Sequence, residues 1–443
     1  MKIVLPANVE KIIGVLEAAG YEAYAVGGCV RDSVLGRIPA DWDITTSAKP
    51  EQVKALFRRT VDTGIEHGTV TVMMEKTGYE VTTYRIDGEY RDNRHPSEVS
   101  FTDDLTEDLR RRDFTINAMA YSESRGLVDV FGGIRDLEEG VIRCVGNAED
   151  RFGEDALRIL RAVRFAAQLG FVIEEETARA AGHLAGNLKH ISAERIQTEL
   201  VKLLVSPHPE LLYQAWKLGL TKVFLPEFDA CMETEQNNPH HMYSVGMHTL
   251  KALEYVEEKR VLRLAVLCHD FGKPAAKTTV DGIDHFRSHG KISEELAKKV
   301  MSRLKFDNDT VSKVCRLVRY HDLRPEPTPR AVRRAVNQVG EDLFPELLQI
   351  CGADILAQSP YQKQQKLMRL DRIQELYEEI RNRGECVSLK SLAVTGKDLI
   401  EAGMKPGKEM GAALQKLLEH VLDEPEHNTR EYLMEHWREL TGV

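Results

Sequence analysis

Two aspartates near the N-terminus, Asp41 and Asp43, are separated by one tryptophan in the segment ADWDITT. We expect this segment to form a strand, which projects both carboxylates to one side of a sheet. Two hard acidic ligands so placed suit Mg²⁺, which takes a few carboxylates together with substrate phosphate oxygens. Such metal ions can activate an attacking hydroxyl and stabilise a leaving pyrophosphate. The alternative is a pair of solvated carboxylates on an edge strand.

A glycine pair lies upstream of the aspartates, in GGCVRD (27–32), between a predicted strand and a predicted helix. Glycine lets backbone N–H groups such as that of Gly28 approach phosphates, and a helix N-terminus adds a favourable dipole. Arg31 is a candidate ligand for a triphosphate. A Gly-Gly turn alone indicates only a turn, but together with the aspartates it predicts a nucleoside triphosphate site.

Two further residues are candidates for the same site. Glu80 lies in the β-rich run YEVTTYRID (79–87), and an adjacent strand can aim it at the same metals; the alternative is a surface glutamate. Arg112 lies in RRRDFTINAMAY (110–121), a basic cluster before a predicted helix start. We expect Arg112 to contact the triphosphate. In the alternative, Asp113 caps the helix and the arginines face solvent.

These segments also carry a family resemblance. GGCVRD, DWD, RRRDFTINAMA and EDALRILRAVRF, in this order, resemble the class II tRNA nucleotidyltransferase and poly(A) polymerase family, over about residues 20 to 205. The resemblance implies an α+β fold: an N-terminal β-polymerase-like head with a mixed sheet and helices, followed by all-helical neck, body and tail regions. It also implies template-independent, Mg²⁺-dependent nucleotidyl transfer to the 3′ end of tRNA, with release of pyrophosphate.

The resemblance further implies that Asp155, Arg158, Arg161 and Arg164 bind the nucleotide. We expect one continuous helix over 152–171, on which Asp155 and Arg158 share a face. An aspartate accepts from the exocyclic amine of cytosine or adenine, and an arginine donates to the neighbouring ring acceptors. Uracil and guanine present a carbonyl instead, a mismatch of roughly 1–3 kcal/mol. An intrahelical salt bridge, worth about 0.3–0.5 kcal/mol, is the alternative. Arg164 faces away from Asp155 and either touches phosphate or supports the site.

Members of this family add CCA, CC only, A only or poly(A). CC-only enzymes lack a flexible loop before the RRDFT motif, and here EYRDNRHP (89–96) supplies such a loop. Poly(A) members resemble GRRFRL where this chain has TGIEHGTVTV (63–72). We therefore expect CCA addition from CTP and ATP, with A-only or poly(A) synthesis as alternatives. A catalytically silent RNA-binding protein is disfavoured, because both head carboxylates and the Asp155–Arg158 pair are in place.

A second constellation lies in the histidine-rich middle of the chain, around LCHDFGKP. It resembles the HD phosphohydrolase superfamily, which implies a metal held by His248, His269, Asp270 and Asp354. His289 and His321 then suit a second metal. Such ligands favour Mn²⁺, Fe, Ni²⁺ or Mg²⁺. The resemblance implies phosphodiesterase or phosphatase activity, which in an alternative interpretation is the main activity of the protein; a vestigial site is the other alternative.

The breaks in the helical period, together with the two family resemblances, imply four regions. We expect a catalytic head at 1–125, a helical neck that reads the base and binds RNA at 126–238, an HD-type metal-binding domain at 239–360 and a helical tail at 361–443. The tail segment 392–414 resembles the family's tRNA-contacting tail, and a hairpin that only stabilises the body is equally consistent. We expect the acceptor stem and 3′ end of tRNA to be held through shape and phosphate contacts.

Bulk composition limits where the protein works. Seven scattered cysteines without a CxxC pair indicate a reduced, cytoplasmic protein. We expect no membrane association, because no run approaches the ~18 apolar residues of a membrane span. The net charge of −10 is unusual for a protein that binds nucleic acid, so RNA contacts must use local basic patches such as 110–112.

Overall fold

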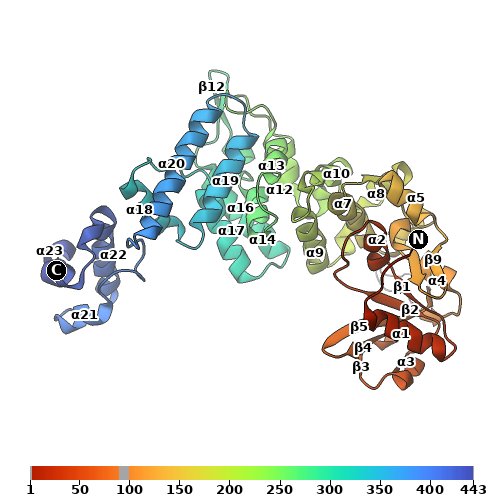
Figure 1. Cartoon of the computed structure of the whole chain (residues 1–443). Coiled ribbons are helices and arrows are strands. Elements are labelled where there is room, and N and C mark those ends of the chain that lie inside the picture. The colour runs from red at the N-terminus through yellow and green to blue at the C-terminus, as the bar shows by residue number, and fades with distance from the viewer. Residues whose placement is uncertain (1, 89–98, 443) are drawn as a thin grey trace. The chain divides into compact units, whose positions relative to one another are not determined.

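The computed structural model describes residues 2–88 and 99–442, so the predicted loop at 89–96 lies outside the described residues. The chain divides into two compact units, Met1–Pro226 and Glu227–Val443. An α+β unit with one large sheet is followed by a predominantly helical one, which confirms the predicted fold class (Figure 1). The four predicted regions are finer than these two units and stay a prediction.

The sheet of the first unit has seven strands in the order β3-β4-β5-β2-β1-β8-β9. Their bounds are β1 Ala23–Val26, β2 Asp43–Thr46, β3 Thr60–Gly64, β4 Thr69–Met74, β5 Thr77–Thr83, β8 Met119–Ser122 and β9 Gly126–Asp129. The sheet is mixed, because β2 pairs in parallel with β5 and antiparallel with β1. A separate pair joins β6 (Arg85–Asp87) and β7 (Val99–Phe101).

Three helices accompany these strands: α1 (Ala7–Ala18), α2 (Gly28–Val34) and α3 (Pro50–Leu56), of which α1 and α3 are seen beside the sheet in Figure 1. Apolar residues at helical spacing predict a helix over 8–19, and this prediction is confirmed by α1. It buries Val9, Ile12, Ile13 and Leu16, whose spacing places them on one face of the helix. Burying that stripe against β1 holds the strand from which the glycine turn starts.

Two predictions for the end of the head are wrong. The run RRR closes α4 (Leu105–Arg110) and is followed by a single 3₁₀ turn at Thr115–Asn117 and then by strand β8, not by a helix. Asp113 accepts hydrogen bonds from the backbone N–H of Phe114 (2.8 Å) and from the Asn117 amide (3.1 Å), which bends the chain back into the sheet. The sequence pattern also predicts a helical period from about residue 105 onward, and this is wrong, because β8 and β9 complete the sheet first.

The rest of the first unit is mostly helical. Its elements are α5 (Gly133–Glu139), α6 (Ala148–Glu154), α7 (Leu157–Leu169), α8 (Glu175–His183), α9 (Ala193–Leu204), α10 (Leu212–Lys217) and α11 (Thr221–Phe224), with a short pair β10 (Val141–Ile142) and β11 (Val172–Ile173). The segment AERIQTELVKLL (193–204) predicts a helix, and this prediction is confirmed by α9. The prediction of one helix over 152–171 is wrong, because the chain is extended at Asp155 (φ −136°, ψ 102°) between α6 and α7.

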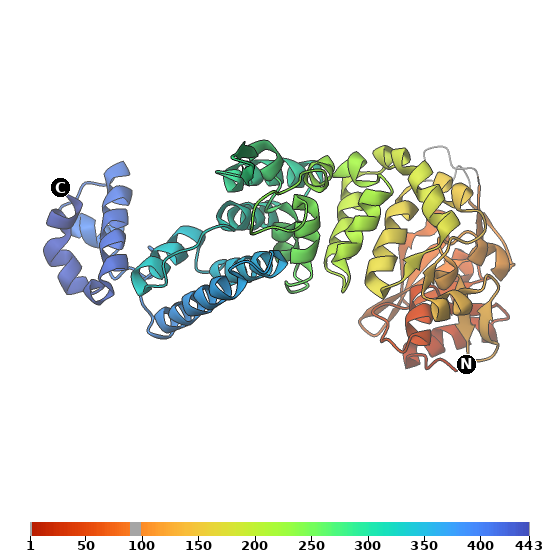
Figure 2. The same cartoon turned by 90° about the horizontal axis from the view of Figure 1, so that it is seen from above.

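The second unit is built mostly of helices, as Figure 2 shows. Its buried polar side chains include His248, His269, Asp270 and Asp354. It contains α12 (Pro226–Met232), α13 (Val245–Leu253), α14 (Arg260–Cys268), α15 (Lys273–Ala276), α16 (His289–Arg303), α17 (Asn308–Tyr320), α18 (Pro329–Val339), α19 (Phe344–Ala357) and α20 (Lys363–Asn382). Strands β12 (Thr278–Val280) and β13 (Ile283–His285) form a hairpin. The segment DGIDHFRSHG (281–290) supplies its turn and second strand and then begins α16.

The last helices have an apolar core of their own. Helices α21 (Gly396–Glu401), α22 (Lys408–Asp423) and α23 (Arg430–Thr441) enclose side chains that include Leu399, Leu417, Val421, Leu433 and Trp437. The segment KPGKEMG (405–411) predicts a turn, which is confirmed only up to Gly407, because α22 begins at Lys408. Within the described ranges, every helix is too short or too polar to cross a lipid bilayer.

Candidate functional site

The two N-terminal aspartates lie at the start of β2. Asp41 precedes the strand, Asp43 is its first residue, and both are exposed. Asp43 pairs with Val26, the residue directly before the glycine turn. On the other side of β2, the parallel register Ile44↔Val81 brings Glu80 level with Asp43. Register partners on parallel strands project to the same face, so Asp43 and Glu80 share a face of the sheet.

Arg112 lies on the same face. Thr45, two residues after Asp43, donates to Asp108 Oδ2 (3.1 Å), and Arg112 Nη2 donates to that oxygen at 3.4 Å. Partial desolvation raises the pKa of Asp43; the charge of Arg112 opposes this shift, and the negative charge of Asp41 adds to it. Repulsion between two neighbouring carboxylates is relieved by a cation, so this donor set fits a hard divalent metal.

The glycine turn approaches Arg112 closely. Gly27 has a φ of +83°, and a Cβ at this position would lie 3.0 Å from Arg112 Nη1. Both observations favour glycine here. Gly28 begins α2, and Arg31 on that helix is buried. Arg31 Nη1 donates to Asn117 Oδ1 (2.8 Å), and its guanidinium lies 5.0 Å from the centre of the Phe165 ring. Arg31 therefore ties the glycine turn to α7.

Asp155 and Arg158 do not share a helix face as predicted, because Asp155 lies outside both helices. Its Oδ1 accepts from the backbone N–H of Leu157 (3.0 Å), and its Oδ2 accepts from Arg195 Nη2 (2.7 Å). Arg158 is held separately: it donates to Glu154 Oε2 (2.6 Å) and to two backbone carbonyls. The acid and the arginine are thus each fixed by partners of their own.

The other two arginines of α7 support this region from inside. Arg161 donates to Asp113 Oδ2 (2.7 Å). Burial alone would raise the pKa of Asp113, but the charge of Arg161 and hydrogen bonds from Asn117 and Arg161 hold it well below its usual range. Arg164 is buried, pairs with Glu199 of α9 and lies 3.7 Å from the centre of the Phe165 ring. These contacts indicate that Arg161 and Arg164 support the site and do not contact phosphate.

Sequence reasoning did not find Arg195 and Glu199. They are four residues apart on α9, so they lie on one helix face. Each pairs across the sequence, with Asp155 and Arg164 respectively. Their spacing within AERIQTELVKLL was a visible signal, but nothing in the sequence shows which helix that face meets.

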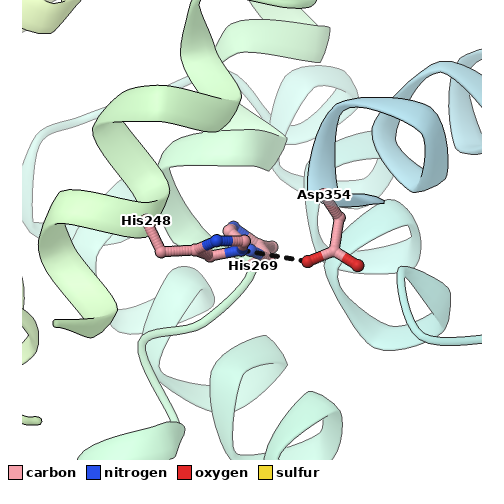
Figure 3. A group of neighbouring side chains, drawn as sticks. All are labelled: His248, His269 and Asp354. Carbon is pink, nitrogen blue, oxygen red and sulfur yellow. Dashed lines mark hydrogen bonds and ion pairs between the residues drawn. The ribbon is translucent and has the colours of Figure 1, made fainter. Parts of the chain in front are cut away.

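In the second unit the structure brings all six predicted HD residues together. His248 lies on α13, His269 directly follows α14, and Asp354 lies on α19; one ligand atom from each lies within 4.8 Å of the others. Figure 3 shows the two imidazoles beside each other with the Asp354 carboxylate facing them. His248 Nε2 lies 3.0 Å from Asp354 Oδ1. All three side chains are nearly inaccessible to solvent.

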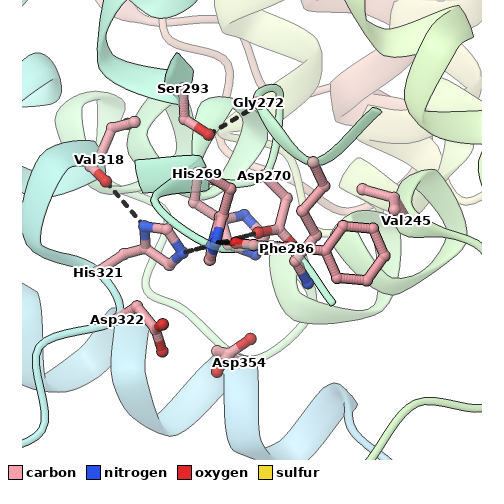
Figure 4. Close-up of polar contacts among 12 residues, drawn as sticks. Val245, His269, Asp270, Gly272, Phe286, Ser293, Val318, His321, Asp322 and Asp354 are labelled. Atoms are coloured by element: carbon pink, nitrogen blue, oxygen red, sulfur yellow. Dashed lines mark hydrogen bonds and ion pairs between the residues drawn. The ribbon is translucent and has the colours of Figure 1, made fainter. Parts of the chain in front are cut away.

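Asp270, His289 and His321 form the adjoining group, with one ligand atom from each within 4.8 Å of the others. Figure 4 labels Asp270 and His321 of this group. His289 is the first residue of α16, and His321 directly follows α17. Asp270 Oδ1 lies 3.4 Å from His289 Nε2 and 3.6 Å from His321 Nε2, while its Oδ2 lies 3.2 Å from His269 Nε2. Asp270 therefore bridges the two groups.

Backbone carbonyls orient three of the four histidines. The Nδ1–H groups of His269, His289 and His321 donate to the carbonyls of Val266 (2.6 Å), Phe286 (2.8 Å) and Val318 (2.7 Å). In neutral rings this leaves each Nε2 with a lone pair that points into the cluster, which is how metal-binding histidines are commonly held. His289 Nε2 and His321 Nε2 are only 3.0 Å apart, a separation that needs a cation or a proton between them.

Buried polar atoms without a hydrogen-bond partner mark the same centre. His269 Nε2 and Asp270 Oδ1 are among them in the described chain, while Asp270 Oδ2 forms an ion pair with Lys273 Nζ (2.8 Å). Burial alone would raise the pKa of Asp270, but the charges of His269 and Lys273 hold it well below its usual range. Since buried polar groups without a hydrogen-bond partner are costly, this nitrogen and oxygen donor set fits divalent transition metals.

The turn after Asp270 needs a glycine to close the cluster. A Cβ on Gly272 would lie 2.4 Å from the carbonyl oxygen of His289, and Gly272 N donates to Ser293 Oγ (2.9 Å; Figure 4). A cavity of about 410 Å³ opens beside the cluster. Its lining includes Asp270, Lys273, His289, His321, Asp354 and Gln358 together with Ile283, His285 and Phe286 of the hairpin region.

Comparisons with known proteins identify the family. The family model "Poly A polymerase head domain" matches residues 23–143, "Probable RNA and SrmB- binding site of polymerase A" matches 170–232, and "tRNA nucleotidyltransferase domain 2" matches 283–437. A CCA-adding enzyme of Lactobacillus helveticus is 36% identical over 429 residues, which cover 97% of this chain and 96% of the relative. The chain belongs to the family of CCA-adding enzymes.

Two further similarities agree with this assignment. A CCA-adding enzyme of Lactiplantibacillus plantarum is 54% identical over 208 residues, a match that spans 46% of this chain and 51% of that relative. The crystal structure of the Bacillus stearothermophilus CCA-adding enzyme in complex with CTP is similar over 98% of both chains, with a TM-score of 0.72 and 31% identity. The predicted family and fold are thereby confirmed.

Proposed function

We propose that this protein adds C, C and A to the 3′ end of tRNA, using CTP and ATP without a template and releasing pyrophosphate. The observation that carries the proposal is the face of the head sheet on which Asp43, Glu80 and Arg112 meet beside the glycine turn. The full-length similarity to CCA-adding enzymes supports it.

Asp41 and Asp43, with Glu80 as the third acid, would hold Mg²⁺ through oxygen ligands. When bound, Mg²⁺ would activate the terminal hydroxyl of the RNA and stabilise charge on the phosphates. Arg112 places a positive charge on the same face, which favours the triphosphate. The glycine turn offers backbone N–H groups close to it, and buried Arg31 holds that turn in place through Asn117.

Asp155 and Arg158 would read the base. The Asp155 carboxylate accepts from the exocyclic amine of cytosine or adenine, and Arg158 donates to the adjacent ring acceptors. Arg161 and Arg164 hold the helix that carries Arg158, through Asp113 and Glu199. In this proposal the catalytic head extends beyond the predicted boundary at 125, because β9 (Gly126–Asp129) is the edge strand of its sheet. The residues that follow, up to 238, read the base and bind RNA, and 361–443 contact tRNA along its shape and phosphates.

Nucleotide incorporation into a tRNA transcript that lacks its CCA end tests this function. We expect CTP and ATP together, with Mg²⁺, to give two C additions and one A addition followed by a stop. Addition of A only, and only to a transcript ending in CC, would instead make this an A-adding enzyme. A long A tail would indicate poly(A) synthesis. No incorporation would contradict the proposal.

A second, metal-dependent activity is favoured by the histidine cluster. We propose that His248, His269, Asp270 and Asp354 hold one metal ion, that His289 and His321 with Asp270 hold a second, and that the site hydrolyses phosphoesters. Mn²⁺, Ni²⁺, Fe or Mg²⁺ suits the ligands. Lys273 lies 2.8 Å from Asp270, and Arg324 lies 2.9 Å from Asp354 Oδ2, so the centre also carries positive charge that attracts a phosphoester.

Hydrolysis of bis(p-nitrophenyl) phosphate and of p-nitrophenyl phosphate, with each metal in turn, tests the second activity. Release of p-nitrophenol that disappears in the variant His269→Ala supports it. Equal rates in both proteins would assign any hydrolysis to a contaminant.

We also propose that the protein works in the cytoplasm, because all seven cysteines are free and buried.

A further inference from the structure

Asp155 is held in an unusual way for a residue that reads a base. It is extended and lies between α6 and α7, and its carbonyl accepts from the backbone N–H of Arg158 (3.0 Å), so the backbone is fixed while the side chain points free of both helices' own hydrogen bonds. Two groups donate hydrogen bonds to its carboxylate. The backbone N–H of Leu157 donates to Oδ1, and the Arg195 guanidinium donates from Nη2 to Oδ2 (2.7 Å) and from Nη1 to Oδ1 (3.4 Å). Arg195 comes from α9, 40 residues further along the chain.

The geometry of this contact leaves room for a base. An ionised carboxylate has about four lone-pair positions, and the N–H groups of Leu157 and Arg195 use about three of them. The planar fork of an arginine fixes the plane of a carboxylate more firmly than a single donor does. With Arg195 in place, about one lone pair of Asp155 is left to accept from an exocyclic amine.

Arg158, by contrast, does not depend on Arg195. Its side chain is held by Glu154 and by the carbonyls of Arg151 and Arg111, none of which lies on α9. Asp155, which accepts from the amine of the base, and Arg158, which donates to its ring acceptors, are therefore held by different partners. The amine-accepting half is the one that distinguishes cytosine and adenine from uracil and guanine.

Helix α9 also holds the far end of α7. Glu199, one turn after Arg195 on the same face, pairs with buried Arg164. The side chains of Asp155 and Arg195 are 17% and 26% exposed, so their contact is accessible to a nucleotide and yet shielded enough to persist. Helix α9 thus sets the position of the carboxylate relative to α7.

We propose that Arg195 is a positioning residue for nucleotide selection: it orients Asp155 so that the carboxylate accepts from the amine of cytosine or adenine. This inference rests on the proposed base-reading role of Asp155. In Arg195→Ala only the Leu157 contact remains on Asp155, and the carboxylate can turn away. We expect UTP and GTP misincorporation, relative to CTP and ATP, to rise about tenfold. The KM for tRNA should not change.

The test is a comparison of kcat/KM for all four triphosphates among full-length variants. Arg195→Lys keeps the charge without the fork and should fall between wild type and Arg195→Ala, which a merely structural role would not require. Arg179→Ala on α8 is the matched control, because it removes an arginine from a surface pair with Glu175. Thermal unfolding of each variant separates misfolding from lost selectivity. Arg195→Gln is included because its longer side chain fills more of the space of Arg195 than alanine does.

Asp155→Ala distinguishes the inference from the function on which it rests. If Asp155→Ala loses selectivity and Arg195→Ala, Arg195→Gln and Arg195→Lys retain it, the inference is wrong and the base-reading proposal stands. If Asp155→Ala selects nucleotides like wild type, both the inference and the base-reading proposal fail.

Tighter binding of CTP and ATP by Arg195→Ala with unchanged selectivity would overturn the inference, since Arg195 would then compete with the base. Equal selectivity of Asp155→Ala and of the double variant Asp155→Ala/Arg195→Ala supports the inference, because Arg195 then acts on selectivity only through Asp155.

Discussion

The carboxylate face of the head and the histidine cluster of the second unit are both candidate metal sites, but they are built in opposite ways. The head acids Asp41, Asp43 and Glu80 are exposed and lie on or beside two neighbouring strands. The six residues of the cluster are buried, come from five helices or their ends, and contact one another directly. Among the described side chains, groups of three possible metal ligands within 4.8 Å are found in the cluster and not among the head acids.

This difference fits two kinds of chemistry. An exposed pair of carboxylates leaves most positions around a Mg²⁺ ion to water and to substrate phosphates, which suits a metal that arrives with a triphosphate. A buried set of imidazole and carboxylate ligands with orphaned lone pairs suits a resident metal. The head site is therefore expected to be completed by its substrate, and the cluster by its metal alone.

The largest expected effect is that of Asp43→Asn on nucleotide addition. Removing this ligand should lower kcat for addition more than about 100-fold, since even outer partners of metal ligands are commonly worth 10–100-fold. Binding of tRNA, measured by filter binding, should remain at the wild-type level. Addition within a few-fold of wild type would show that Asp43 does not hold the catalytic metal.

The corresponding change in the cluster is Asp270→Asn, which weakens the bridge between the two groups. We expect phosphoester hydrolysis to fall more than about 100-fold and bound transition metal, measured by elemental analysis, to be lost. Nucleotide addition should stay within twofold. Asp309→Asn is the matched control, because Asp309 is exposed on α17, pairs with Lys313 and lies outside both groups. Loss of addition in Asp270→Asn alone would contradict the independence of the two sites.

Metal binding should stabilise the two units unequally. Because the cluster is preformed and buried, Mn²⁺ at about 100 times its Kd should stabilise the second unit by roughly 2.7 kcal/mol. Calorimetry with Mn²⁺ and with EDTA measures the shift, which His269→Ala should abolish. A shift of equal size in His269→Ala would place the stabilising metal elsewhere.

The smallest expected effect is that of Glu80→Gln. Glu80 is exposed on the neighbouring strand, so it contributes less to the metal site than Asp43 does. We expect roughly a tenfold fall in kcat with little change in the KM for CTP. Thr77→Ala, at an exposed position of the same strand, controls for damage to β5. An unchanged kcat would remove Glu80 from the site and leave two acids.

The sequence predicted the parts of each site that lie close together in the chain. The alternation around Asp43, the glycine turn and the exact extent of α9 were all readable from local pattern. The break at Asp155 was not, because residues 152–171 are rich in helix-forming Ala, Leu and Arg and the carboxylate is held from α9. Strand β8 was missed because a short buried strand is an apolar run without alternation.

The HD-like residues were predicted from family order, and their spacing in the chain shows nothing of the bridge that Asp270 makes. That bridge depends on the ends of α14 and α17 and the start of α16 meeting, which is settled by helix packing. The carbonyl contacts that orient the three imidazoles are local, each three residues upstream. They recur because a histidine just past a helix end, or at a helix start, can reach back to that carbonyl.

The most direct test of two independent metal sites is to measure both activities on the same preparations of wild type, Asp43→Asn and His269→Ala. We predict that Asp43→Asn loses addition of C and A to tRNA and retains phosphoester hydrolysis, while His269→Ala does the reverse. If either substitution removes both activities from a folded protein, or if His269→Ala alone abolishes nucleotide addition, the account of a catalytic head and a separate metal cluster is contradicted.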